Sequence, residues 1–263
     1  MLRKILSSNS ETPGETGSRE IFTSNLSVNE FLLLQEVGFE PVGMVMGSSV
    51  YYIRYPTGRL YQNQEIKALS DAMYKARDQA VQEMQKEASK LKAHGIVGVS
   101  LEISQHELGE EMAEFVAIGT AVRSLNRQSY LKNQKLPFTS DLSGQDFWTL
   151  LQAGYRPVGM VMGSCVYYVY RQGISQWFSQ FGRNVEMSNY TNAFYDAREL
   201  AMSRMQAEAT KLKADGIVGM QIHEHSHSWE ADVMEFFAIG TAIKALPVSK
   251  ERAFTASSVL LND

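Results

Sequence analysis

The sequence predicts an α+β fold made of two tandem β-α-β-β modules, each with an antiparallel sheet covered by one long helix and preceded by a short helix. Three observations predict it. Blocks of sequence occur twice along the chain, apolar residues alternate with small or polar ones in several stretches, and one long stretch per copy carries alanine at helical spacing.

The internal repeat divides the chain. Pro41–Ser48 returns unchanged as Pro157–Ser164, an offset of 159 − 43 = 116 residues, whereas Ala76-Arg77 returns as Ala197-Arg198, an offset of 198 − 77 = 121 residues. The second copy therefore contains 121 − 116 = 5 more residues between these blocks. Because the period is that of a domain rather than of a solenoid repeat, each copy is expected to be a domain.

The repeat predicts five segments. Residues 1–21 are rich in Ser, Thr, Gly and Glu, which is typical of a flexible tail. Residues 22–125 form the first module, and residues 138–246 form the second. The polar stretch 126–137 is expected to be a linker, and residues 247–263 a second tail.

Each copy is expected to open with a short helix. Ser27 can cap the helix that contains Phe31–Leu34, and Gly38 suits the left-handed position after its end. In the second copy, Ser143 and Gly154 bracket the corresponding stretch.

A strand and a long helix follow. Two glycines lie on one face of the strand at 42–54, which indicates that another backbone approaches this face closely. They are Gly43 and Gly47, repeated as Gly159 and Gly163. The stretch from about Asp71 to Ala93 has alanines four residues apart, and we expect this ridge to lie over the glycine face. Gly95 is expected to end the helix.

Two further strands complete each module. Val97, Val99, Leu101 and Ile103 are expected on one face of the first, and Glu114–Val122 forms the second. One helix covers only one face of such a three-stranded sheet, so its other face is expected to need a partner. The sequence therefore predicts self-association into a homo-oligomer.

Composition excludes several classes of protein. The 263 residues carry a net charge of −4, so no basic stripe for nucleic acid is expected. The single cysteine, Cys165, excludes a disulfide within the chain. We find no apolar run long enough to span a membrane and no signal peptide, so we expect a cytoplasmic protein. No phosphate loop, dinucleotide fingerprint, nucleophile elbow or zinc-protease motif occurs, so we expect no enzyme and no required cofactor.

One cluster has metal-ligand chemistry. His223, His225 and His227 alternate along one strand of the second copy, with Glu230 and Asp232 beyond, and imidazoles on one face can bind Zn²⁺, Ni²⁺ or Cu²⁺. A solvated strand edge also explains this pattern, because the equivalent first-copy residues, Glu102, Ser104 and His106, are polar as well.

Charged residues also fall among apolar ones. Arg77 and Arg198 lie in the alanine-rich helices, and Glu114 and Glu235 lie on strands, so each arginine is expected to pair with a glutamate of its own or a neighbouring subunit. Catalysis by such a carboxylate has no second motif to support it.

The paired methionines, the paired tyrosines and the single cysteine can each be interpreted as packing residues or as a chemical site. The paired methionines suit core packing or copper(I) binding, the paired tyrosines suit a strand contact or an aromatic ligand site, and the cysteine is expected to be a buried, inert thiol. The residues are Met44, Met46, Met160, Met162, Tyr51, Tyr52, Tyr167, Tyr168 and Cys165.

Together these blocks resemble a known family. Val42–Gly47, the helix around Ala76-Arg77, Ala93–Gly98 and Glu114–Val122 are similar to the YbjQ-like family, also called the putative heavy-metal-binding domain family, and both copies carry the match. The resemblance implies a dodecin-like subunit that assembles into ring-shaped pentamers, without an established activity. Because this chain is duplicated, its two modules can share one ring or lie in two stacked rings.

Overall fold

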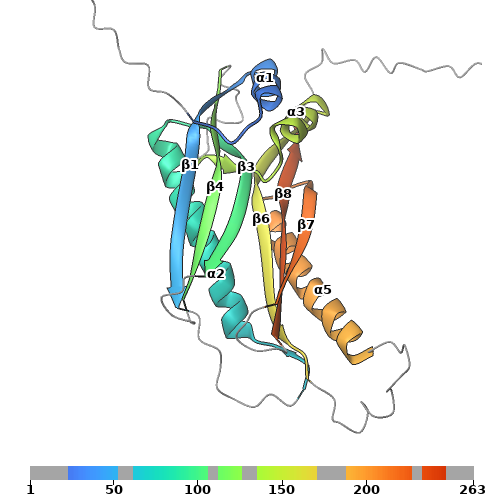
Figure 1. The fold of residues 1–263 in the computed structure, drawn as a ribbon. Helices are drawn as coiled ribbons and strands as arrows, with labels where there is room; N and C mark the ends of the chain where they lie inside the picture. Colours follow the sequence, from blue (N-terminus) through green and yellow to red (C-terminus); the bar gives the residue numbers. More distant parts are fainter. Residues whose placement is uncertain are drawn as a thin grey trace, which may run out of the picture.

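A computed structural model describes residues 23–52, 62–105, 112–125, 135–170, 188–226 and 233–246 (Figure 1). It contains two four-stranded sheets and four helices within these ranges, which confirms the α+β fold with two modules. No helix among the described residues is long and apolar enough to cross a membrane.

The first sheet has the strand order β1-β4-β3-β5. Its three long strands are β1 (Phe39–Tyr52), β3 (Gly95–Gln105) and β4 (Met112–Ser124), and β4 pairs antiparallel with both of its neighbours. Helix α2 (Lys67–Lys90) connects β1 to β3 and covers one face of this sheet.

The second sheet repeats this arrangement with the order β2-β6-β8-β7. Its long strands are β6 (Tyr155–Tyr168), β7 (Gly216–Ser226) and β8 (Val233–Ala245), again antiparallel, and α5 (Ser188–Lys211) packs on one face. Figure 1 shows the two sheets side by side.

Each module lends a two-residue strand to the other module's sheet. Strand β2 (Gln64–Glu65), which precedes α2, pairs antiparallel with β6. Strand β5 (Phe138–Thr139) pairs parallel with β3. These exchanges tie the modules together through backbone hydrogen bonds.

The short helices lie at one end of the molecule (Figure 1). Ser27 caps helix α1 (Val28–Glu36) and Ser143 caps helix α3 (Gly144–Gln152), as expected. Gly38 and Gly154 follow them with φ of 78° and 83°. The Gly144 N–H donates to Glu30 Oε1 at 2.9 Å, which joins the two helices across the modules.

The alanine ridge of α2 lies directly on the glycine face of β1. A Cβ on Gly47 would stand 2.1 Å from the carbonyl oxygen of Ala80 and 2.3 Å from the Met84 nitrogen. In the second module a Cβ on Gly163 would stand 1.9 Å from the Ala201 carbonyl oxygen. Gly43 and Gly159 meet only leucine side chains, at 3.3 and 3.1 Å.

Two local expectations were wrong. Helix α2 ends at Lys90, and Lys92 rather than Gly95 takes the left-handed conformation, with φ of 56°. Gly95 is instead the first residue of β3. A bulge at Gly98, with φ of 62°, shifts the pairing of β3 with β4, so Val97 packs in a different cluster from Val99.

Candidate functional site

The interface between the modules is built around helix α2. One side of α2 packs on its own sheet, and its other side packs on the face of the second sheet that α5 leaves bare. One continuous apolar cluster results. Its second-module members are Met160, Met162, Val166, Val233, Phe237 and Ile239.

A buried ion pair joins the modules at this interface. The Arg77 guanidinium on α2 donates to both carboxylate oxygens of Glu235 on β8, at 2.5 and 3.1 Å, and the two side chains are 2% and 0% exposed. Ser164 Oγ also donates to Glu235, at 2.8 Å. The guanidinium carbon lies 4.0 Å from the ring centroid of Phe237. Arg77 therefore pairs with a glutamate of the other module of the same chain.

Polar side chains of both long helices satisfy backbone groups of strand β6. The Val166 N–H donates to Ser70 Oγ of α2 at 2.8 Å, and the Met162 N–H donates to Glu208 Oε2 of α5 at 2.7 Å. Tyr74 on α2 donates a hydrogen bond to the same Glu208. Burial raises the pKa of the Glu208 carboxyl and also that of the Tyr74 hydroxyl, whose hydrogen bond to Glu208 raises it further.

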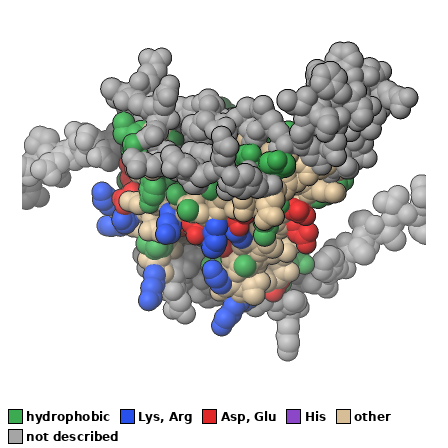
Figure 2. Space-filling view, turned by 90° about the horizontal axis from the view of Figure 1, so that it is seen from below, with side chains coloured by type: hydrophobic (Ala, Val, Ile, Leu, Met, Phe, Trp, Pro, Cys, Tyr) green, Lys and Arg blue, Asp and Glu red, His purple; other side chains and the backbone are tan. Residues whose placement is uncertain are grey.

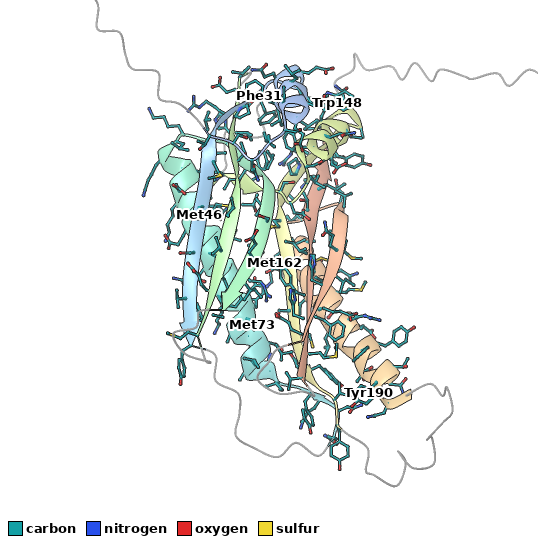
Figure 3. All side chains as sticks on the ribbon, in the orientation of Figure 1. Phe31, Met46, Met73, Trp148, Met162 and Tyr190 are labelled. Carbon is teal, nitrogen blue, oxygen red and sulfur yellow. The ribbon has the colours of Figure 1, made fainter. Side chains whose placement is uncertain are left out.

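The equivalent face of the first sheet is open. Met44, Met46 and Val50 on β1 are 45%, 55% and 58% exposed, whereas their counterparts Met160, Met162 and Val166 are 8%, 4% and 0% exposed. In Figure 3, Met162 lies between the modules and Met46 lies at the outer side of the molecule. An identical sequence block therefore has a partner in one copy and solvent in the other.

Arg198 and Glu114 have different surroundings from Arg77 and Glu235. Arg198 on α5 pairs with Glu224 of its own module, and both side chains are more than a third exposed. Glu114 lies half-buried on β4, opposite Val50 of β1. Sequence reasoning missed Glu224, because the equivalent first-module residue is the apolar Ile103.

Two of the three predicted metal ligands lie together. His223 and His225 project from the same side of β7 with ring centroids 6.3 Å apart, and His223 stacks on Phe237. Both line a groove of about 720 Å³ between the modules. His227, Glu230 and Asp232 lie outside the described residues. In the described part of the chain, no group of three or more His, Cys, Asp or Glu is placed to hold a metal ion.

Cys165 is fully buried beneath α5. Burial raises the pKa of its thiol to about 12, so the thiol is protonated at neutral pH. Met160 and Met162 pack against α2 in the interface. These side chains therefore contribute to packing.

Charges are mixed on the face seen in Figure 2. Lys and Arg side chains appear at several places on the described part of that face, together with acidic, hydrophobic and uncharged ones.

Comparisons with known proteins follow the same division into modules. A family model described as "Putative heavy-metal-binding" matches residues 59–124 and 154–246. A protein of Mycobacterium tuberculosis named encapsulin nanocompartment protein is 46% identical over 224 residues, which are 85% of this chain and 86% of that protein. A UPF0145 protein of Pseudothermotoga lettingae is 36% identical over 35% of this chain and 88% of its own length. A UPF0145 protein of Pseudomonas putida is 35% identical over 32% of this chain and 84% of its own length.

The UPF0145 relatives are therefore about one module long, whereas the mycobacterial protein matches across both modules. The two-fold match of the family model agrees with the repeat in the sequence and with the two sheets of the structure. The chain belongs to the YbjQ-like family described as "Putative heavy-metal-binding", as a tandem duplication of its module.

Proposed function

We propose that this protein is a non-enzymatic, self-assembling scaffold that forms a ring-shaped homo-oligomer. The open face of β1 carries this proposal, because the same residues in the second module are buried under a helix. An exposed apolar surface of this kind is typical of an interaction site. The charged groups of the covered interface pair with one another, which favours assembly over acid–base chemistry.

The relative from Mycobacterium tuberculosis supports a scaffold role, since its name places it in a nanocompartment assembly. The groove between the modules would give such an assembly space for small ligands. Two modules that lie side by side favour a single shared ring over two stacked rings. Because each chain then adds two modules, the ring contains an even number of modules, unlike the five-module ring that the resemblance implies. We also propose a cytoplasmic location.

Native mass spectrometry of the full chain tests the assembly. We expect a discrete multiple of the 29.5 kDa chain mass, because a closed ring has a fixed number of subunits. The same measurement with and without a chelator separates assembly from metal binding. A mass of one chain over a wide range of protein concentration would overturn the proposal.

A second candidate function is transition-metal binding by His223, His225 and His227. This candidate is favoured because His223 and His225 project from the same side of β7, with their ring centroids 6.3 Å apart. In a closed ring, the three histidines of every copy would be repeated around the ring axis. Folding of the chain would not require a bound metal.

Titration calorimetry with Zn²⁺, Ni²⁺ and Cu²⁺ tests this candidate. The triple alanine variant of the three histidines is expected to lose a binding site that the wild-type chain has. A control variant carries alanine at Glu102 and Ser104, the equivalent first-module positions, and should bind as the wild type does. Equal binding by the wild type and the triple variant would reject the metal site.

A further inference from the structure

We propose that helix α5 of a second copy covers the open face of β1 and β4, so that copies join head to tail. The contact between copies then repeats the contact that α2 makes between the modules of one chain. This inference rests on the proposed self-assembly and names the two surfaces that carry it.

The helix side of the internal interface is present a second time on α5. Helix α2 uses the side chains of Ser70, Tyr74 and Arg77. At an offset of 121 residues, α5 carries the same chemical groups; they are Thr191, Tyr195 and Arg198. Tyr195 is 65% exposed, although its counterpart Tyr74 is half-buried against Glu208. Helix α5 thus carries the same three polar groups, and Tyr195 among them is exposed to solvent.

The sheet side is present a second time on the first module. The internal interface offers Glu208 and Glu235 as acceptors, and the open face offers the equivalent Glu87 and Glu114. Glu87 is already in place, because it accepts the Met46 N–H at 2.6 Å just as Glu208 accepts the Met162 N–H at 2.7 Å.

Charge complementarity selects α5 as the occupant. Among the described residues, the open face of β1 and β4 carries Glu114 and no arginine, so two such faces placed against each other would bring like charges together, and buried like charges are costly. Helix α5 instead brings Arg198 to Glu114 and Tyr195 to Glu87. Because the two surfaces differ and both belong to one chain, the contact is heterologous and can close a ring.

Assembly also changes the partner of Arg198. In the single chain Arg198 binds Glu224, whereas in the assembly it binds Glu114 of the next copy. Glu224 therefore competes with assembly. The first module has no such competitor, since Ile103 stands at the equivalent position.

Cross-linking between copies tests the head-to-tail contact. All variants also carry Cys165→Ser, so that no native cysteine reacts. Serine is the residue at the equivalent first-module position, Ser49. One chain carries Tyr195→Cys and a differently tagged chain carries Glu87→Cys, and the two are co-expressed and treated with a short bismaleimide. We expect a covalent product that contains one chain of each tag. As a matched control, Tyr74→Cys with Glu208→Cys in one chain should cross-link internally with the same reagent.

Products that join two chains of the same tag, or no product from a protein that is oligomeric by mass, would overturn the head-to-tail contact and leave the proposed self-assembly standing. A mass of one chain would reject the self-assembly itself.

Charge variants give a second readout, the protein concentration at which half of the assembly dissociates. Glu114→Gln leaves Arg198 without its partner in the next copy, and we expect this concentration to rise at least about a hundredfold. Glu224→Gln removes an exposed competitor, and we expect a fall of about two- to fivefold. An unchanged midpoint in Glu114→Gln would contradict the pairing between copies.

Discussion

Gly47→Ala is expected to lower the free energy of unfolding by about 3 kcal/mol or more. The added Cβ would stand 2.1 Å from the Ala80 carbonyl oxygen and 2.3 Å from the Met84 nitrogen, both of which are backbone atoms of α2. A flexible side chain can turn away from such a contact, but a helix backbone inside a packed interface cannot. The helix must therefore move away from the sheet, and its contacts with the second module move with it.

Urea unfolding at a fixed protein concentration measures this loss, because the stability of an oligomer depends on concentration. Gly43→Ala is the matched control. It lies on the same face of the same strand, but its Cβ would meet only the end of the Leu91 side chain, at 3.3 Å. We expect a loss of less than about 1.5 kcal/mol for the control. Equal stability of Gly47→Ala and the wild type would show that α2 does not lie on this face.

The sequence predicted the elements of each module well where one residue type has one physical use. Ser27 and Gly38 bracket α1, and Ser143 and Gly154 bracket α3. These ends could be predicted because few residue types can cap a helix with a side chain, and because glycine adopts a positive φ more readily than other residues. The glycine and alanine spacing predicted the contact of helix and sheet for a similar reason. Strands β2 and β5 could not be predicted, since two residues have no periodicity and their partners lie in the other module.

The environment of the candidate site could not be predicted from the repeat alone. Two nearly identical blocks predict two identical environments, yet a chain with two modules contains only one interface between modules. Met162 is therefore buried and Met46 exposed, and Arg77 and Arg198 have different partners, although the local sequences match. The difference arises from position in the chain. The pairing of each arginine with a glutamate was expected. Arg77 binds Glu235, one of the two glutamates named for it, whereas Arg198 binds Glu224, which was not named.

Glu235→Gln is expected to destabilise the single chain by about 3–5 kcal/mol, because it leaves the charge of a fully buried arginine without a counter-ion. The Arg77 guanidinium carbon lies 5.4 and 4.0 Å from the ring centroids of Phe115 and Phe237, and the side chain is 2% exposed, so water cannot replace the lost carboxylate. The substitution keeps the shape of the side chain and changes its charge. Chemical denaturation measures the loss.

The exposed pair of the second module supplies the control. Arg198 and Glu224 are each more than a third exposed, so Glu224→Gln is expected to change the stability of the single chain by no more than about 1 kcal/mol. Replacing both members of the buried pair, as Arg77→Met with Glu235→Leu, should recover most of the stability that Glu235→Gln loses, because no unpaired charge is then left in the apolar interface. If Glu235→Gln and Glu224→Gln destabilised the chain equally, the ion pair at the centre of the module interface would not be desolvated, and the complementary surfaces inferred from it would lose their basis.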